Sequence, residues 1–142
     1  TIAHPHMQII GLHDINYKEN IAEEVFEGIV IEEINGVRLT LSTKPKVGFY
    51  EFNIDMDDTS YNETFGVHLQ KTVHYILNNF PFKASSYNLF FHHYNRRIYV
   101  KIVPRFVTTP LYIGYGIPQV PNNLHWMADD IKSKYFSDSG SA

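Results

Sequence analysis

Residues 27–42 read EGIVIEEINGVRLTLS, and this stretch decides the fold. Val37, Leu39 and Leu41 alternate with polar residues, which is the period of a strand with one buried face. The first half of the stretch is another apolar run, and Asn35-Gly36 separates the two. Because Asn and Gly tolerate the positive φ angles of a tight turn, the stretch predicts a β-hairpin.

The longest helix is expected over residues 61–79. Its apolar residues recur at spacings of three and four, as in a helix with one buried face: Phe65, Leu69, Val73, Ile76 and Phe80. Ser60 followed by Glu63 predicts a capping box at the start, and Pro81 ends the pattern.

The remaining segments complete an α+β order. A strand is expected over residues 49–55, two more over residues 87–92 and 98–106, and a C-terminal helix over residues 124–136. Together with the hairpin and the long helix, these elements predict an antiparallel sheet with one long helix packed on a face.

Composition limits the class of protein. The chain has 142 residues, of which 44% are hydrophobic and 19% charged, so it is long enough for one folded domain and is not a disordered chain. A net charge of −3 argues against a nucleic-acid-binding surface. There is no cysteine, which excludes disulfides and thiolate chemistry and fits a cytoplasmic location. No apolar run approaches the roughly 18 residues of a membrane helix, so no membrane partner is expected.

The clearest chemical motif is His4-Pro5-His6-Met7-Gln8. In an extended segment, residues 4, 6 and 8 point the same way, which would bring two imidazoles and a carboxamide together. A neutral imidazole can attack phosphorus, and a carboxamide can donate to a phosphoryl oxygen. The alternative is an N-terminal segment that carries two histidines by chance.

This motif resembles the HPHGQ sequence of the galactose-1-phosphate uridylyltransferases, in the histidine-triad (HIT-like) superfamily. The segments SYNLFFH (residues 86–92), IYVKIVPR (98–105) and YIGY (112–115) resemble the second half of that family. The resemblance extends from Thr1 to about Tyr115 and implies a HIT-like fold. It also implies that His6 carries a nucleotidyl group covalently, that Gln8 binds its phosphoryl group, and that His4 supports them.

The sequence departs from the family in two places. Met7 replaces the glycine of HPHGQ, which removes the close backbone approach that glycine allows. Arg97, Tyr99 and Lys101 occupy the alternating strand positions where HIT-like domains usually present histidines, so this domain is not a working histidine triad. Only His92 matches a family metal-binding histidine, and we therefore expect neither a metal nor a cofactor.

The resemblance predicts a domain division. Residues 1–12 would end a preceding HIT-like half, residues 13–136 would form the C-terminal HIT-like domain, and residues 137–142 would be a mobile tail. We expect the natural protein to be longer, because the chain starts at Thr1 rather than at methionine. The other possibility is a remnant that has lost its original activity.

Two functions follow from these patterns. The first is transfer of a nucleoside monophosphate, UMP by resemblance, between a nucleotide sugar and a sugar phosphate through His6. Arg97, Tyr99 and Lys101 would then bind phosphate, although a solvated sheet face or edge strand explains them equally well. The second is a non-catalytic domain for dimerisation or nucleotide binding, whose aromatic residues line an interface in a homodimer.

Overall fold

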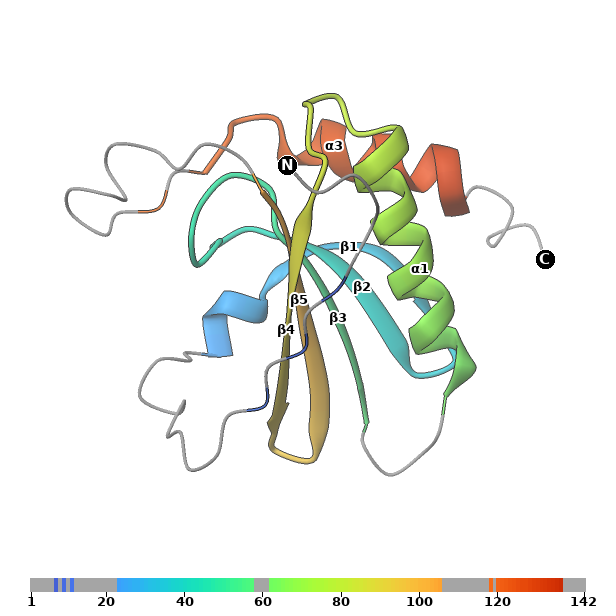
Figure 1. Cartoon of the computed structure of the whole chain (residues 1–142). Helices are drawn as coiled ribbons and strands as arrows, with labels where there is room; N and C mark the ends of the chain where they lie inside the picture. Colours follow the sequence, from blue (N-terminus) through green and yellow to red (C-terminus); the bar gives the residue numbers. More distant parts are fainter. Residues whose placement is uncertain are drawn as a thin grey trace.

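A computed structural model of the chain describes residues 23–57, 62–105 and 120–136, together with Met7, Ile9, Gly11 and Pro118. Its elements, in chain order, are η2 (Glu23–Phe26), β1 (Gly28–Ile34), β2 (Val37–Ser42), β3 (Phe52–Asp57), α1 (Glu63–Asn78), β4 (Tyr87–Tyr94), β5 (Arg97–Pro104), α3 (Leu124–Ile131) and η3 (Lys132–Phe136). The strands form one antiparallel sheet in the order β1-β2-β3-β5-β4 (Figure 1). This confirms the α+β class, with one long helix on the sheet and a helix at the C-terminal end.

Two tight hairpins build most of the sheet. In the β1–β2 hairpin, Asn35 and Gly36 have φ angles of 54° and 76°, as the Asn-Gly sequence predicts. In the β4–β5 hairpin, Asn95 and Arg96 have φ angles of 50° and 60°. Both connections use two residues with positive φ, which matches the right-handed twist of the flanking strands.

Strand β3 begins three residues later than the sequence predicts. Gly48 and Phe49 have φ angles of 141° and 63°, so the chain is still turning where the apolar alternation begins. From Phe52 onward the strand pairs with β2 on one side and β5 on the other. Phe52 to Asp55 are all buried, which shows that both faces of the sheet are covered at its centre.

The N-terminus of α1 is capped by Asn62. Its side chain accepts a hydrogen bond from the backbone N–H of Thr64 at 2.9 Å, so the predicted Ser60–Glu63 capping box is wrong. Glu63 is the first helical residue, and Ser60 lies outside the described residues. The physical reason is that Asn62 already supplies a side-chain oxygen at the position where the helix starts.

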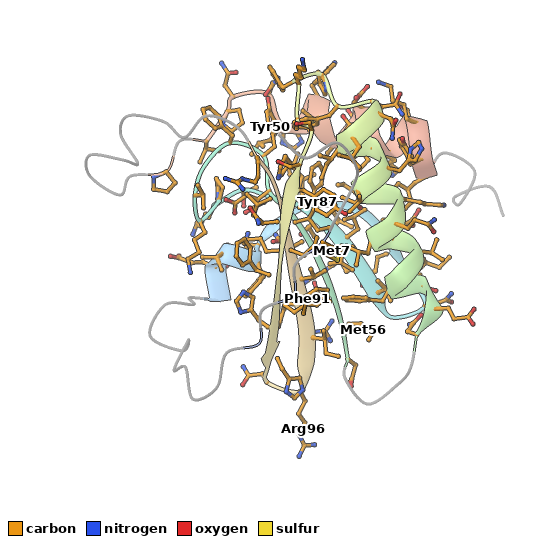
Figure 2. The ribbon with its side chains drawn as sticks, viewed as in Figure 1. Met7, Tyr50, Met56, Tyr87, Phe91 and Arg96 are labelled. Carbon is orange, nitrogen blue, oxygen red and sulfur yellow. The ribbon has the colours of Figure 1, made fainter. Side chains whose placement is uncertain are left out.

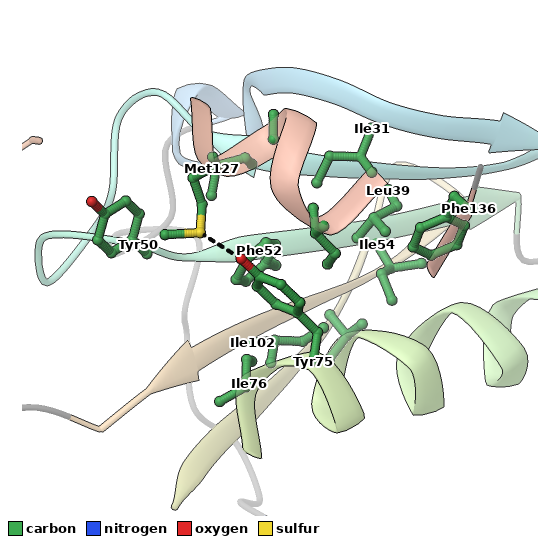
Figure 3. Packing of buried hydrophobic residues seen from close by; sticks show 14 of the residues in the cluster. Ile31, Leu39, Tyr50, Phe52, Ile54, Tyr75, Ile76, Ile102, Met127 and Phe136 are labelled. Atoms are coloured by element: carbon green, nitrogen blue, oxygen red, sulfur yellow. Dashed lines mark hydrogen bonds between the residues drawn. The ribbon is translucent and has the colours of Figure 1, made fainter. Parts of the chain in front are cut away.

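The hydrophobic core lies on one face of the sheet, under α1 and α3. Its apolar side chains come from β1, β2, β3 and β5 and from both helices (Figure 3). Tyr75 of α1 reaches across this core, and its hydroxyl contacts the Met127 sulfur of α3 at 3.1 Å. One side chain of the long helix therefore ties the C-terminal helix to the same core. Among the described residues, no helix has the length and apolar character needed to cross a membrane.

Candidate functional site

The face of the sheet opposite the core carries a row of polar side chains, which we call the polar face. In the antiparallel register of β3 and β5, Asn53 pairs with Lys101 and Asp55 with Tyr99. Directly paired residues project to the same side, so the polar residues of both strands meet there. Glu51 and Asn53 are fully buried, and Lys101 is 3% exposed.

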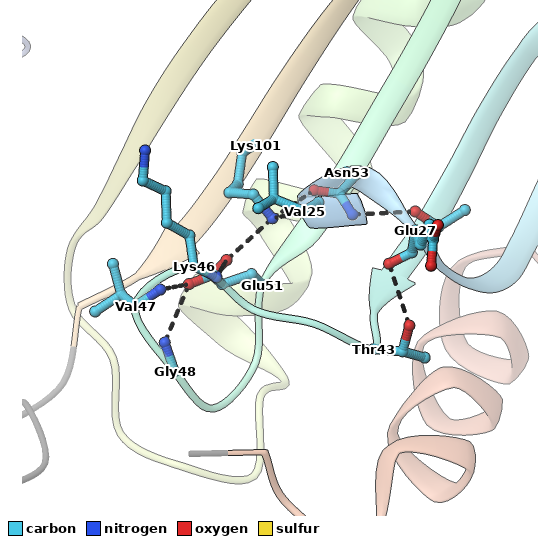
Figure 4. Close-up of polar contacts among 10 residues, drawn as sticks. Val25, Glu27, Thr43, Lys46, Val47, Gly48, Glu51, Asn53 and Lys101 are labelled. Carbon is cyan, nitrogen blue, oxygen red and sulfur yellow. Dashed lines mark hydrogen bonds and ion pairs between the residues drawn. The ribbon is translucent and has the colours of Figure 1, made fainter. Parts of the chain in front are cut away.

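Lys101 lies at the centre of the polar face. Its Nζ donates to the Val25 carbonyl oxygen at 2.7 Å and to Asn53 Oδ1 at 2.9 Å, and it lies 3.0 Å from Glu51 Oε1 (Figure 4). Burial lowers the pKa of Lys101, while the Glu51 carboxylate acts in the opposite direction. All three hydrogens of the ammonium group have an acceptor, so this lysine joins η2 to β3 and β5.

Glu51 connects the same cluster to the loop before β3. Its carboxylate accepts the backbone N–H groups of Lys46 and Val47, each at 2.8 Å, and that of Gly48 at 3.3 Å (Figure 4). The positive φ of Gly48 lets the loop fold back toward this carboxylate. Glu51 therefore neutralises Lys101 and fixes the loop with a single side chain.

A second ion-paired group lies further along β3. The Asp55 carboxylate is fully buried, with Arg38 Nε at 3.3 Å from one oxygen and Arg97 Nη2 on the other. The hydrogen bond to Asp55 raises the pKa of Arg97. The two guanidinium side chains are 44% and 37% exposed, so this group, unlike Lys101, is open to solvent.

Aromatic contacts cover the middle of β5. The Tyr99 ring stacks on Phe26 of η2 at a centroid distance of 4.4 Å, and Tyr99 is 6% exposed. The ring of His92, on β4, meets Phe26 edge-on at 5.6 Å. Burial, followed by the charges of Lys46 and Lys101, lowers the pKa of His92, which favours its neutral form.

The structure brings three of the predicted site residues together. Arg97, Tyr99 and Lys101 share the polar face, and each already has partners within the domain. Arg97 is the most exposed of the three and is thus the best placed to meet a ligand. The alternative interpretation as an edge strand is wrong, because β5 lies between β3 and β4. Tyr99 and Lys101 are buried, whereas Arg97 is partly exposed.

The other predicted site residues, His4, His6 and Gln8, lie outside the described residues. Of their motif the structure places Met7, which is 63% exposed (Figure 2). Figure 2 also shows Arg96 at the tip of the β4–β5 hairpin and Tyr50 toward the opposite end of the sheet. Within the described ranges, no group of three His, Cys, Asp or Glu residues could hold a metal ion.

The sequence interpretation missed Glu51, Asn53 and Asp55 as members of one cluster. In the structure, Asp55 forms ion pairs with Arg38 and Arg97. The available signal was the polar residue at every second position of a predicted strand. When a strand with this alternation pairs with a strand that carries cations at every second position, as β3 pairs with β5, the two strands can form a buried ion-paired face.

The fold and the polar face define an α+β domain with helices on one face and internal ion pairs on the other. Residues 18–136 match a family model described as the C-terminal domain of a domain of unknown function, DUF4931. The chain belongs to this DUF4931 family. No curated protein matches the chain.

A solved structure supports the same family. The chain is similar to the crystal structure of a DUF4931 family protein from Bacillus cereus ATCC 10987, with a TM-score of 0.77 and 39% sequence identity. The match covers 96% of this chain and 63% of that protein, so the chain spans less than two thirds of its relative's length. The family match begins after the HPHMQ motif.

Proposed function

We propose that the intact protein is a nucleotidyltransferase in which His6 carries a nucleoside monophosphate. A ring nitrogen of His6 attacks the α-phosphorus of a nucleotide sugar, the bond from that phosphorus to the bridging oxygen breaks, and a sugar phosphate leaves. The phosphate oxygen of a second sugar phosphate then attacks the same phosphorus and breaks the phosphorus–nitrogen bond. Gln8 donates to the phosphoryl oxygens during both steps.

One observation carries this proposal: an HPHMQ motif precedes a domain whose strand β5 holds no histidine. HIT-like domains usually present histidines at the positions of Arg97, Tyr99 and Lys101. Two of these residues, Tyr99 and Lys101, are buried in internal contacts. β5 therefore supplies no histidine nucleophile, and the resemblance of HPHMQ to the HPHGQ sequence supports His6 in that role. The described domain then acts mainly as the platform for that segment.

Arg97 has a direct role in this proposal. Its guanidinium group is 37% exposed and shares Asp55 with Arg38, so two cations surround one carboxylate. The exposed part of the Arg97 guanidinium can attract the phosphate of the sugar phosphate, and guanidinium geometry suits that group. Tyr99 and Lys101 contribute by holding β5 and η2 in place beneath it.

Intact-protein mass spectrometry tests the proposal. The wild-type protein is incubated with UDP-glucose and a panel of other nucleotide sugars, and a covalent nucleotidyl adduct is expected. His6→Asn should abolish the adduct. His125→Asn is the matched control, because His125 is an exposed histidine on α3, and it should leave the adduct unchanged. Full adduct formation in His6→Asn, or none with any donor in a folded wild-type protein, would refute this function.

A second candidate is a non-catalytic domain that forms a homodimer, and strand β4 favours it. β4 is an end strand of the sheet, and its adjacent residues Phe90 and Phe91 are 47% and 58% exposed on opposite faces. Exposed aromatic side chains are enriched in protein interfaces. A concentration series by analytical ultracentrifugation should show a dimer that Phe91→Ser weakens and that Val67→Ser, an exposed control on α1, does not. A monomer at all concentrations would exclude this function.

A further inference from the structure

The π-helical segment η3 is held against α1 by two histidines. His68 packs its ring on Phe136, with the ring centroids 5.2 Å apart. His74, almost two turns further along α1, has Nδ1 at 2.5 Å from the Tyr135 hydroxyl. The two neighbouring residues of η3 therefore each contact one histidine of the same helix.

The first contact depends on a neutral His68. Its side chain is almost fully buried, and neither ring nitrogen makes a hydrogen bond of normal geometry within the described part of the chain. Burial lowers the pKa of His68, against smaller opposing effects of the Thr64 backbone and the Glu32 carboxylate. A proton on this ring would place an unsolvated cation against the Phe136 ring.

The second contact is the hydrogen bond between Tyr135 and His74. The amide Nδ2 of Asn79 lies 2.6 Å from the Tyr135 hydroxyl oxygen and can only donate to it. The hydroxyl hydrogen of Tyr135 is then free to be donated to His74 Nδ1.

A cation stands between the two histidines. Lys71 Nζ donates to the Tyr135 carbonyl oxygen at 3.4 Å and lies 5.0 Å from the centroid of the Phe136 ring. Its charge acts in the same direction as burial and lowers the pKa of His68. The other charged groups nearby are Glu32 on β1, Asp130 on α3 and Lys134 on η3; the last two form an ion pair with each other.

We propose that His68 makes the contact between α1 and η3 a pH-sensitive latch, which holds η3 on α1 while the His68 ring is neutral and releases it on acidification. The Tyr135–His74 hydrogen bond is the second contact that this release breaks. The released segment leaves the His68 imidazole in water, with its ordinary pKa near 6.5. Because burial lowers the pKa of His68 in the closed state, the released state binds more protons below that value. The closed state thus loses stability as the pH falls through about 6.5, and it is unaffected above about pH 7.5.

Hydrogen–deuterium exchange of the whole chain tests the latch. Peptides covering residues 124–136 are compared with β3 peptides at pH 7.5 and 5.5, after correction for the intrinsic exchange rates. Protection of the C-terminal peptides should fall by up to about tenfold at the lower pH, since one titrating group contributes up to tenfold per pH unit. Protection of β3 should be unchanged.

Variants distinguish release of the latch from a general loss of stability in acid. His68→Leu, or His68→Gln if the leucine variant fails to fold, should abolish the pH response. His74→Gln, at an exposed position, should lower the protection of residues 124–136 at both pH values, because it removes the Tyr135 contact. His125→Gln is the control and should retain the full response. Equal protection at both pH values in the wild type would overturn the proposal. So would a full response in a folded His68 variant.

Discussion

Replacing Lys101 with methionine removes the cation from the most buried ion pair of the domain. Methionine keeps most of the apolar stem but leaves Glu51 without its counter-charge, and it leaves Asn53 Oδ1 and the Val25 carbonyl oxygen without their donor. All of these groups belong to the polar face, and Glu51 and Asn53 are fully buried. The substitution therefore creates unsatisfied polar atoms in a place that water does not reach.

The size of the effect follows from that burial. Removing one partner of a buried ion pair lowers the free energy of unfolding by about 3–5 kcal/mol. Glu51 retains three backbone N–H donors from the preceding loop, so we expect the lower end, about 3 kcal/mol. For a chain of 142 residues this corresponds to a fall in Tm of roughly 10 °C.

Urea and thermal unfolding monitored by circular dichroism measure the change. Lys83→Met is the control, because Lys83 is exposed, and it should change the free energy of unfolding by less than about 0.5 kcal/mol. The Lys101→Met/Glu51→Gln double variant should be more stable than the sum of the two single changes implies, by about 1 kcal/mol or more. A loss below about 1 kcal/mol for Lys101→Met, or strict additivity, would refute a buried ion pair at this position.

Three further changes test other parts of the fold by urea unfolding. Asp55→Asn should lower the free energy of unfolding by about 2 kcal/mol, because it removes the buried negative charge that pairs with two partly exposed arginines. An unchanged free energy of unfolding would contradict these ion pairs. Asn62→Ala should cost about 1 kcal/mol by removing the cap of α1, and Asn62→Ser should recover most of it. Gly36→Ala should cost about 1 kcal/mol because φ is +76°, although a Cβ would meet no other atom; an increase in stability would show that the turn is not as described.

The elements set by local sequence could be predicted. The β1–β2 hairpin needs only the Asn-Gly pair and the alternation on either side of it, and both are contiguous in the chain. The long helix likewise shows its period within one segment. Its buried side nevertheless includes His68 and Thr72, which the apolar stripe did not reveal, because tertiary packing rather than composition decides which polar residues are covered.

The polar face could not be predicted to the same extent. Glu51 and Lys101 are fifty positions apart in the chain, and they meet only because β3 pairs with β5 in one particular register. A sequence shows the two charges but not that register. The burial of Lys101 also depends on η2, whose Val25 carbonyl oxygen accepts from it, and so short a segment gives no reliable periodic signal.

The start of α1 shows how neighbouring candidates compete. Ser60 and Asn62 are both good capping residues, and a capping-box pattern favoured the serine. The chain uses Asn62, whose side-chain nitrogen also donates to the Asn35 carbonyl oxygen in the β1–β2 turn. That second contact joins the helix to the hairpin and is invisible in a local pattern.

The most direct test of the proposed function is to locate the covalent adduct in the sequence. The full natural protein is treated with the nucleotide sugar that gives the highest adduct yield, digested under mildly alkaline conditions that preserve phosphoramidates, and mapped by tandem mass spectrometry. Our account predicts a nucleotidyl group on His6. An adduct on a residue of β5 or elsewhere in the described domain, or a protein that turns over nucleotide sugars with His6 replaced, would contradict it.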